Sequence, residues 1–216
     1  MITIVDYGRG NLFSLGQALR HLGAAFTVSD DPDRVAAAER IILPGVGAFG
    51  DAARGLAARG LAEAVTAAGT AGTPILGICV GCQLLLSTGE EFGTHAGLDL
   101  IPGTVARLPE ARADDPDPIR IPNVGWRRLE TRADDPLLAA LEPEDMVYFV
   151  HSYAPMVAEE ADATAWLVIN GARVSVAVRR DNVMGVQFHP EKSGPVGLRV
   201  LARFVAPHAG RGRPPS

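Results

Sequence analysis

Apolar residues in the first 90 positions alternate between short β-rich runs and longer stretches, rich in alanine and leucine, at helical spacing. This pattern predicts strands at 2–6, 26–29, 40–43 and 73–78, helices at 11–22 and 34–38, two helices within 49–68, and the start of another helix at 83–87. Strands that alternate with helices are typical of a parallel sheet with helices on both faces.

After residue 87 the helical spacing disappears until the end of the chain. The pattern then predicts strands at 105–108, 147–151, 165–169, 174–179 and 183–188, and a last helix at 198–205. N-G-A at 170–172 and D-N at 181–182 are typical of hairpin turns, so we expect part of the sheet to be antiparallel. The fold class predicted is α/β, with a central, mostly parallel mixed sheet between two layers of helices.

Length and composition favour one domain. The chain has 216 residues, of which 47% are hydrophobic, and its mean hydropathy is +0.14, which is enough for one substantial core. We expect that domain to span 1–205. An acidic, proline-rich segment at 109–118 is predicted to be a loop, and 206–216 a disordered tail.

Charge and hydropathy narrow the classes of function. The net charge is −5, with acidic and basic residues interspersed, so nucleic-acid binding is not expected. No apolar run approaches the roughly 20 residues that cross a bilayer, and the N-terminus lacks the pattern of an export signal. We therefore expect a cytoplasmic protein that does not bind membranes.

Cys79 stands where the strand predicted at 73–78 turns into a helix, with Gly77 and Gly81 on either side. Small neighbours let the backbone bend sharply and present a nucleophile, as in the G-x-S-x-G elbow. A helix N-terminus favours the thiolate form of a cysteine, and its N–H groups can bind an oxyanion. This segment therefore predicts an activated cysteine nucleophile.

His189 and Glu191 lie two positions apart in Q-F-H-P-E, where the strand predicted at 183–188 ends. Side chains at i and i+2 point to the same face of an extended chain, so the carboxylate can hold the far nitrogen of the imidazole. Alone, the motif also fits a surface turn. Combined with Cys79, it predicts a Cys-His-Glu triad.

Cys79 and Cys82 also form a C-x-x-C motif between a strand and a helix, the setting of redox-active dithiols. A thioredoxin-like chain has this motif near its start, whereas here it follows several α/β units. A dithiol oxidoreductase nevertheless remains an alternative, as does a binding module without catalysis. In the triad interpretation, Cys82 faces the core. A zinc site would need a second cysteine pair, which is absent, and we expect neither metal nor cofactor.

Glycines in P-G-V-G, at 44–47, follow the strand predicted at 40–43 and let a loop approach a ligand closely. In an acyl-transfer site this loop is a second source of N–H groups for an oxyanion. Trp126 follows a glycine turn at 122–126; it would be an interface anchor if exposed and a core residue if buried.

Five motifs, in order between residues 1 and about 204, carry a family resemblance: D-Y-G-R-G-N-L, L-P-G-V-G-A-F, L-G-I-C-V-G-C-Q-L-L, Y-F-V-H-S-Y and G-V-Q-F-H-P-E-K-S. They resemble class I glutamine amidotransferases and, within that class, the glutaminase subunits of imidazole glycerol phosphate synthase. C-x-G-x-Q with H-P-E is specific for the class. D-Y-G-x-G-N, P-x-x-G-W and the stand-alone length favour the narrower group.

The resemblance implies a glutaminase with Cys79 as nucleophile, His189 as base and Glu191 as the acid that orients it. Residues implied to contact glutamine or its oxyanion are Gly45, Val46, Gly47, Val80, Gln83, Ser152 and Tyr153. The implied partner is a (β/α)8-barrel cyclase subunit in a heterodimer, which receives the ammonia. Residues implied to lie at or near that interface are Asn11, Pro122, Trp126, Tyr148 and Lys192.

Three positions depart from the family pattern. The family usually has Met where Cys82 stands, often His where Asn123 stands, and commonly Asn where Arg127 stands. These departures concern the interface rather than the triad. A glutaminase that serves another pathway, such as anthranilate or pyridoxal synthesis, remains an alternative.

Overall fold

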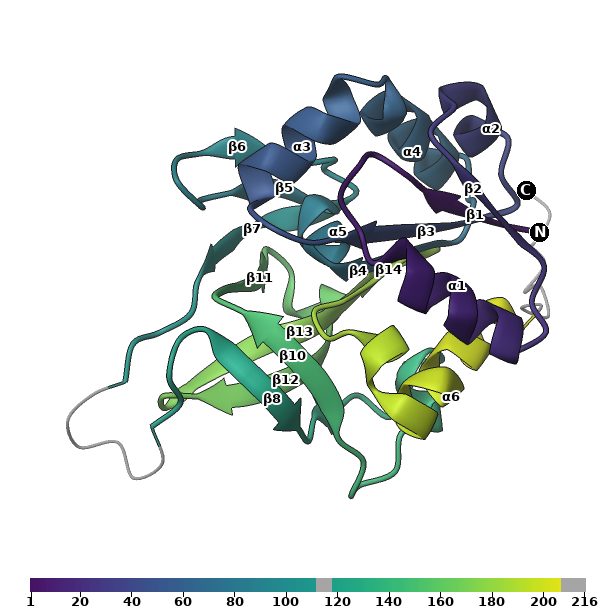
Figure 1. The fold of residues 1–216 in the computed structure, drawn as a ribbon. Coiled ribbons are helices and arrows are strands. Elements are labelled where there is room, and N and C mark those ends of the chain that lie inside the picture. The colour runs from purple at the N-terminus through teal and green to yellow at the C-terminus, as the bar shows by residue number, and fades with distance from the viewer. Residues whose placement is uncertain (112–117, 207–216) are drawn as a thin grey trace, which may run out of the picture.

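The computed structural model describes residues 1–111 and 118–206. Within them, eight strands form a central sheet in the order β2-β1-β3-β4-β14-β13-β12-β9 (Figure 1). These strands are β1 (Ile2–Val5), β2 (Phe26–Ser29), β3 (Arg40–Gly45), β4 (Ile75–Cys79), β9 (Glu130–Thr131), β12 (Ala163–Ile169), β13 (Ala172–Arg180) and β14 (Val183–Val186).

The sheet is mixed, as the sequence predicts. Pairings among β2, β1, β3, β4 and β14 are parallel, and those from β14 through β13 and β12 to β9 are antiparallel. Asn170 and Asp181 have positive φ angles in the turns of the two hairpins predicted at these positions. Strands β1, β4 and β14 are buried along their whole length because helices cover both faces.

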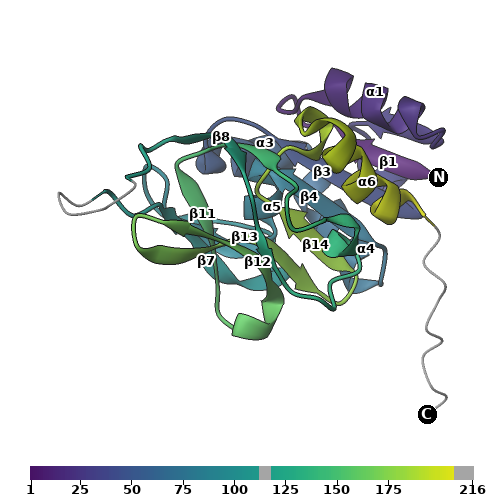
Figure 2. The ribbon, with the colours of Figure 1, turned by 90° about the horizontal axis from the view of Figure 1, so that it is seen from below.

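Helices lie on both sides of this sheet and complete the three layers. Helices α1 and α6 pack together on one face, and α2, α3 and α4 cover the other (Figures 1 and 2). The helices are α1 (Leu12–His21), α2 (Pro32–Ala36), α3 (Phe49–Ala57), α4 (Leu61–Thr70), α5 (Val80–Leu84) and α6 (Gly194–Val205). Residues 1–111 and 118–206 contain no helix long and apolar enough to cross a membrane.

Two smaller sheets flank the carboxyl end of β4. One has the order β11-β7-β5-β6 and the other pairs β10 with β8. Their strands are β5 (Leu86–Gly89), β6 (His95–Ala96), β7 (Ile101–Arg107), β8 (Asn123–Arg127), β10 (Val147–His151) and β11 (Tyr153–Val157). Through β8, β10 and β11 they bring the second half of the chain over the end of the central sheet.

Two local predictions are wrong. The apolar run at 83–87 does not continue as a helix: α5 ends at Leu84, and Leu86 begins β5 by pairing with Ile101 of β7. A run that is apolar on every side has no periodicity to separate helix from strand, so the pairing with β7 decides. The segment predicted as a glycine turn at 122–126 is largely strand β8, which pairs with β10. Within the segments predicted to be loop and tail, residues 112–117 and 207–216 lie outside the described residues.

Glycines at 77 and 81 let α5 pack directly on the backbone of β3 and β4. A Cβ atom at Gly81 would lie 1.8 Å from the carbonyl oxygen of Leu43, and one at Gly77 would lie 2.6 Å from the carbonyl oxygen of Gly81. Both contacts are with backbone, which cannot move aside as a flexible side chain does. Side chains are therefore excluded at these two positions, and the turn at Cys79 is held tightly between them.

We expect Gly81→Ala to lower the free energy of unfolding by about 3 kcal/mol or more, because the methyl group must displace the β3 backbone. Urea denaturation would measure the change. Gly23→Ala is a control for steric overlap: Gly23 has a positive φ of 66°, and nothing lies within 4 Å of the added methyl group. Its cost should be only the backbone strain of about 1–2 kcal/mol. Equal effects would contradict the close-packing argument.

Candidate active site

Cys79 is the last residue of β4 and directly precedes α5. Its backbone has φ 56° and ψ −112°, a strained conformation that a non-glycine residue adopts only when the surrounding structure imposes it. The sharp turn expected from Gly77 and Gly81 is therefore present. Val80, the next residue, begins α5, so its N–H lies in the first turn, where helical N–H groups have no intrahelical acceptor.

His189 and Glu191 form a direct hydrogen bond. The Nδ1–H of His189 donates to Oε1 of Glu191 over 2.8 Å, and both side chains are buried. The contact is the expected one, but its geometric basis differs from the prediction. Pro190–Lys192 forms a 3-10 helix instead of continuing the strand, so a turn, and not the common face of an extended chain, brings the carboxylate back to the imidazole.

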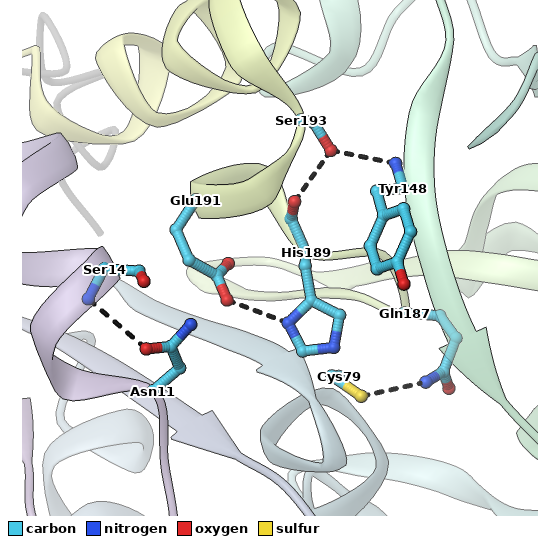
Figure 3. Close-up of polar contacts among 8 residues, drawn as sticks. All are labelled: Asn11, Ser14, Cys79, Tyr148, Gln187, His189, Glu191 and Ser193. Atoms are coloured by element: carbon cyan, nitrogen blue, oxygen red, sulfur yellow. Dashed lines mark hydrogen bonds and ion pairs between the residues drawn. The ribbon is translucent and has the colours of Figure 1, made fainter. Parts of the chain in front are cut away.

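The backbone of His189 is fastened to β10 on the opposite side. Its N–H donates to the carbonyl oxygen of Tyr148 over 2.9 Å. The hydroxyl of Ser193 donates to the carbonyl oxygen of His189 over 2.7 Å and accepts from the N–H of Tyr148 over 2.9 Å (Figure 3). These bonds fix the backbone of His189 relative to β10, and the bond to Glu191 orients its ring.

The imidazole ring of His189 lies between the carboxylate of Glu191 and the sulfur of Cys79 (Figure 3). Its Nε2 atom is buried and has no hydrogen-bond partner among the described residues. Because Nδ1 is committed to Glu191, Nε2 is the nitrogen that can exchange a proton with the sulfur or with a reacting group beside it. The three side chains thus have the relative order of a nucleophile, a base and an orienting acid.

The electrostatics of the site favour the imidazolium form of His189. Burial by itself lowers the pKa of this histidine, but interactions with Cys79 and Glu191 raise it more, so that the pKa rises from 6.5 to about 9. The ring therefore holds a proton at neutral pH, next to the sulfur. An imidazolium in this position stabilises a thiolate and has a proton to give to a leaving group.

A cavity of about 300 Å³ opens at the sulfur, and its size suits a small metabolite. The described residues that line it are Val46, Gly47, Cys79, Val80, Gln83, Glu91, Pro122, Val150, His151, Ser152, Tyr153 and His189. All substrate-contact residues that the resemblance implied are thus brought together here, with the exception of Gly45.

Gly45 is not among the residues that line the cavity. It is the last residue of β3 and pairs with Cys79 of β4. A Cβ atom there would lie 2.6 Å from both the N atom of Gly81 and the hydroxyl of Tyr7. Gly45 therefore allows α5 to approach β3, while Val46 and Gly47 carry the chain into the cavity wall. Gly47 has φ 92°, a conformation that glycine adopts without strain.

Gln83 presents an acceptor to the cavity. Its Nε2 donates to the carbonyl oxygen of Tyr153 over 3.1 Å and to Oε1 of Gln187 over 3.0 Å. Both N–H groups of the amide are thereby used inside the protein, and the amide oxygen is the group that remains for a ligand.

Three polar residues of the site were given no individual role in the sequence analysis, although His151 and Gln187 stand in two of its motifs. Glu91 places a carboxylate in the cavity wall, and its Oε2 accepts from the N–H of Phe49 over 2.8 Å. His151 lines the same cavity, and the amide of Gln187 contacts the sulfur of Cys79. Gln187 stands in the Q-F-H-P-E motif, so its position next to His189 was the available signal. Glu91 had none, because a single glutamate after a β-strand is common on surfaces.

Comparison with known proteins shows the family to which this chain belongs. The family model for class-I glutamine amidotransferases matches residues 3–207. The chain belongs to this family.

Other members are similar over almost their whole length. An imidazole glycerol phosphate synthase subunit HisH from Symbiobacterium thermophilum is 48% identical over 204 residues, covering 94% of this chain and 92% of the relative. The subunit of the same name from Syntrophotalea carbinolica is 44% identical over 204 residues, covering 94% and 98%. A crystal structure described as a glutamine amidotransferase aligns with a TM-score of 0.72 at 18% identity, covering 95% of this chain and 97% of that one, which supports the fold.

In this amidotransferase chain the second cysteine does not share the cavity. Cys82 is completely buried, and its sulfur packs against the backbone of Gly185 in β14. Burial strongly raises the pKa of the Cys82 thiol, with a smaller contribution from Cys79. Both cysteines are free. Cys82 is thus a buried thiol in the core, as the triad interpretation expected.

Residues that the resemblance implied at an interface differ in their position relative to the cavity. Trp126 is 48% exposed and packs edge to face on Tyr148, with ring centroids 5.9 Å apart. Pro122 lines the cavity itself. Lys192 is exposed in the 3-10 helix after His189, and Asn11 caps α1 by accepting from the N–H of Ser14 over 3.3 Å (Figure 3).

Nuclear magnetic resonance titration of the imidazole rings would test these electrostatics. We expect His189 to titrate near pH 9 in the folded protein, and Glu191→Gln to lower that midpoint because the carboxylate no longer stabilises the imidazolium. By linkage, the stability that His189 contributes is complete below pH 6.5, its unfolded midpoint, and is lost as the pH rises through about 9.

His151 is the internal control for that titration, since burial lowers its pKa to about 4 and Glu191→Gln leaves its hydrogen-bond partners, Asn123 and the Tyr153 carbonyl, unchanged. A His189 midpoint below 7 in the unaltered protein would contradict the charged pair.

Proposed function

We propose that this chain is the glutaminase subunit of an imidazole glycerol phosphate synthase, in histidine biosynthesis. One observation carries the proposal: a cysteine on an elbow and an imidazole held by a carboxylate line the same cavity. The 44–48% identity to subunits of that synthase over nearly the whole chain supports the choice of pathway.

Glutamine matches the polar groups of the cavity. The carboxylate of Glu91 and the amide oxygen of Gln83 are acceptors, which suits the α-ammonium group of an amino acid. The hydroxyl of Ser152 supplies a donor for the α-carboxylate. With the amino-acid end bound there, the side-chain carboxamide extends toward Cys79 and His189.

In the first half-reaction the thiolate of Cys79 attacks the carboxamide carbon of glutamine. The N–H groups of Val80 and of the loop at Val46 and Gly47 receive the oxyanion. His189 gives its proton to the amide nitrogen, the C–N bond breaks, and ammonia leaves. A γ-glutamyl thioester remains on the sulfur, and His189 is now neutral.

In the second half-reaction neutral His189 takes a proton from water through Nε2. The hydroxide attacks the thioester carbon, the C–S bond breaks, and the product leaves as the γ-carboxylic acid, which becomes glutamate by giving its proton to solvent. The thiolate and the imidazolium are restored together. Glu191 keeps Nδ1 protonated throughout, so each proton moves through the nitrogen that faces the substrate.

Ammonia produced here must be protected from bulk water, because protonation would remove its nucleophilicity. Exposed apolar side chains lie in the cavity lining and on the adjoining strand β8. Val46 (39% exposed) and Val150 (40%) line the cavity, Val124 (50%) pairs with Val150, and Trp126 (48%) follows on the same strand. An apolar rim of this kind favours a partner that covers the mouth. We propose that the partner is a (β/α)8-barrel cyclase, which uses the ammonia to convert phosphoribosyl-formimino aminoimidazole carboxamide ribotide into imidazole glycerol phosphate and an aminoimidazole carboxamide ribotide.

Substitution of the two cysteines separates glutaminase from dithiol chemistry. Cys79→Ala should lower the rate of glutamate release from glutamine by at least about 10³-fold, since no other thiol lines the described cavity. Cys82→Ala should retain the rate within about threefold, because its sulfur lies in the core. The assay is glutamate formation in the presence of the cyclase subunit. If the two cysteines instead acted together as a redox pair, both variants would lose activity.

Truncation of Trp126 tests the covering surface. We expect Trp126→Ala to weaken binding of the cyclase subunit by about 2 kcal/mol, or about thirtyfold in Kd, measured by calorimetry. Met156→Ala is the matched control, because Met156 is also exposed, at 59%, but lies on β11 away from the cavity lining. Similar losses in both variants would contradict this placement of the interface.

A further inference from the structure

A chain of hydrogen bonds leads from strand β8 to the nucleophile. It runs through side-chain amides, one histidine and one backbone carbonyl, and its last member is Gln187. This side chain is completely buried at the end of β14. Its Nε2 lies 3.7 Å from the sulfur of Cys79, and its Oε1 accepts from Nε2 of Gln83 over 3.0 Å. Figure 3 shows the amide of Gln187 and the ring of His189 reaching the sulfur from different directions.

The orientation of the Gln187 amide is imposed by its neighbours. Nε2 of Gln83 donates to the carbonyl oxygen of Tyr153, and a carbonyl can only accept. The nitrogen of Gln83 therefore faces both Tyr153 and Gln187, so Gln187 must turn its oxygen toward Gln83. Its NH₂ group is then the end that faces Cys79. A rotated amide would leave two donors facing each other at Gln83.

The carbonyl of Tyr153 is itself held from the other side. Nδ1 of His151 donates to it over 2.9 Å, Nε2 of His151 accepts from Nδ2 of Asn123 over 3.0 Å, and Oδ1 of Asn123 accepts from Nε of Arg127 over 3.1 Å. Arginine can only donate, so it sets the direction of every bond up to Tyr153. Burial lowers the pKa of His151 to about 4, which keeps the ring neutral, with one donor and one acceptor nitrogen as these bonds require.

We propose that Gln187 is a positioning residue for the nucleophile, which donates its amide N–H to the thiolate of Cys79 in an orientation set by Gln83 and the Tyr153 carbonyl. The proposal rests on the glutaminase function proposed above. A thiolate accepts a hydrogen bond more strongly than a thiol does, so a fixed donor favours the reactive form. The same bond holds the sulfur between His189 and the cavity.

This role predicts a particular split in kinetics. Gln187 is outside the described residues that line the cavity, so its loss should leave glutamine binding largely intact. It should instead lower the fraction of Cys79 that is ionised and the rate of attack. A residue that only packed the core would change stability and leave the pH dependence of the sulfur unchanged.

The test is the pH profile of Cys79 alkylation by iodoacetamide, followed on the full chain by mass spectrometry of the Cys79 peptide. Gln187→Met removes the donor at similar side-chain length. We expect the midpoint of the profile to move up by about one pH unit, which is about tenfold less reaction at pH values below the midpoint. In the complex with the cyclase subunit, kcat for glutamine hydrolysis should fall about tenfold with little change in KM.

Gln187→Glu is the second variant and covers the case in which the methionine variant does not fold. Its carboxylate still accepts from Gln83 but places an oxygen against the sulfur, so the midpoint should move up further. Val186→Ala is the matched control: it removes buried packing from the same strand without touching the amides. It should lower the melting temperature and leave the midpoint in place.

A folded Gln187→Met or Gln187→Glu protein with the midpoint of the Val186→Ala control would overturn the proposal. Failure of the proposed function would be recognised separately, as absence of glutamate release by the unaltered complex. The alkylation profile needs no glutamine, so it tests the role of Gln187 in either case.

Discussion

The position of the nucleophile depends on the backbone contact between α5 and strands β3 and β4. Because Gly77 and Gly81 lack side chains, α5 rests on the carbonyl of Leu43, and the strained turn at Cys79 has no room to relax. Strain of this kind costs about 1–3 kcal/mol and persists only where the surrounding packing over-determines the backbone. Here that packing is a sheet whose strands are buried on both faces. The core therefore maintains a conformation that Cys79 would not adopt by itself, and it places the sulfur at the carboxyl edge of the sheet.

The buried charge of His189 is stabilised by its neighbours in the site. His189 is buried, which disfavours its charged form, yet Glu191 on one side and Cys79 on the other stabilise the imidazolium. The amide of Gln187 adds a donor at the sulfur, and its partners extend to Arg127 at the strand that carries Trp126. The surface proposed for the cyclase and the surroundings of the nucleophile thus belong to one set of buried hydrogen bonds. Two of its members, Asn123 and Arg127, stand at positions where the resemblance described in the sequence analysis implies other residues.

Local chemistry explains why much of the site could be predicted. The elbow at Cys79 is encoded by flanking glycines, and His189 and Glu191 are close enough in sequence for a contact that needs only one turn. The reason given for that contact was nevertheless wrong, since a 3-10 helix replaces the extended chain. The alternation of strands and helices in the first half followed from hydrophobic spacing, whereas the apolar run at 83–87 carried no such spacing and became β5 by pairing with β7.

The sequence by itself determined the identity of the reactive groups, the order of the main elements and the family, because these reside in residue type, spacing and motif. The tertiary structure decided which polar groups meet. Glu91, His151 and Gln187 look like ordinary residues along the chain, and Gln187 reaches Gln83 and Cys79 only after folding brings together positions more than 100 residues apart. The direction of a hydrogen bond between two amides depends on what each touches at its other end. That information exists only in space, so no local pattern could supply it.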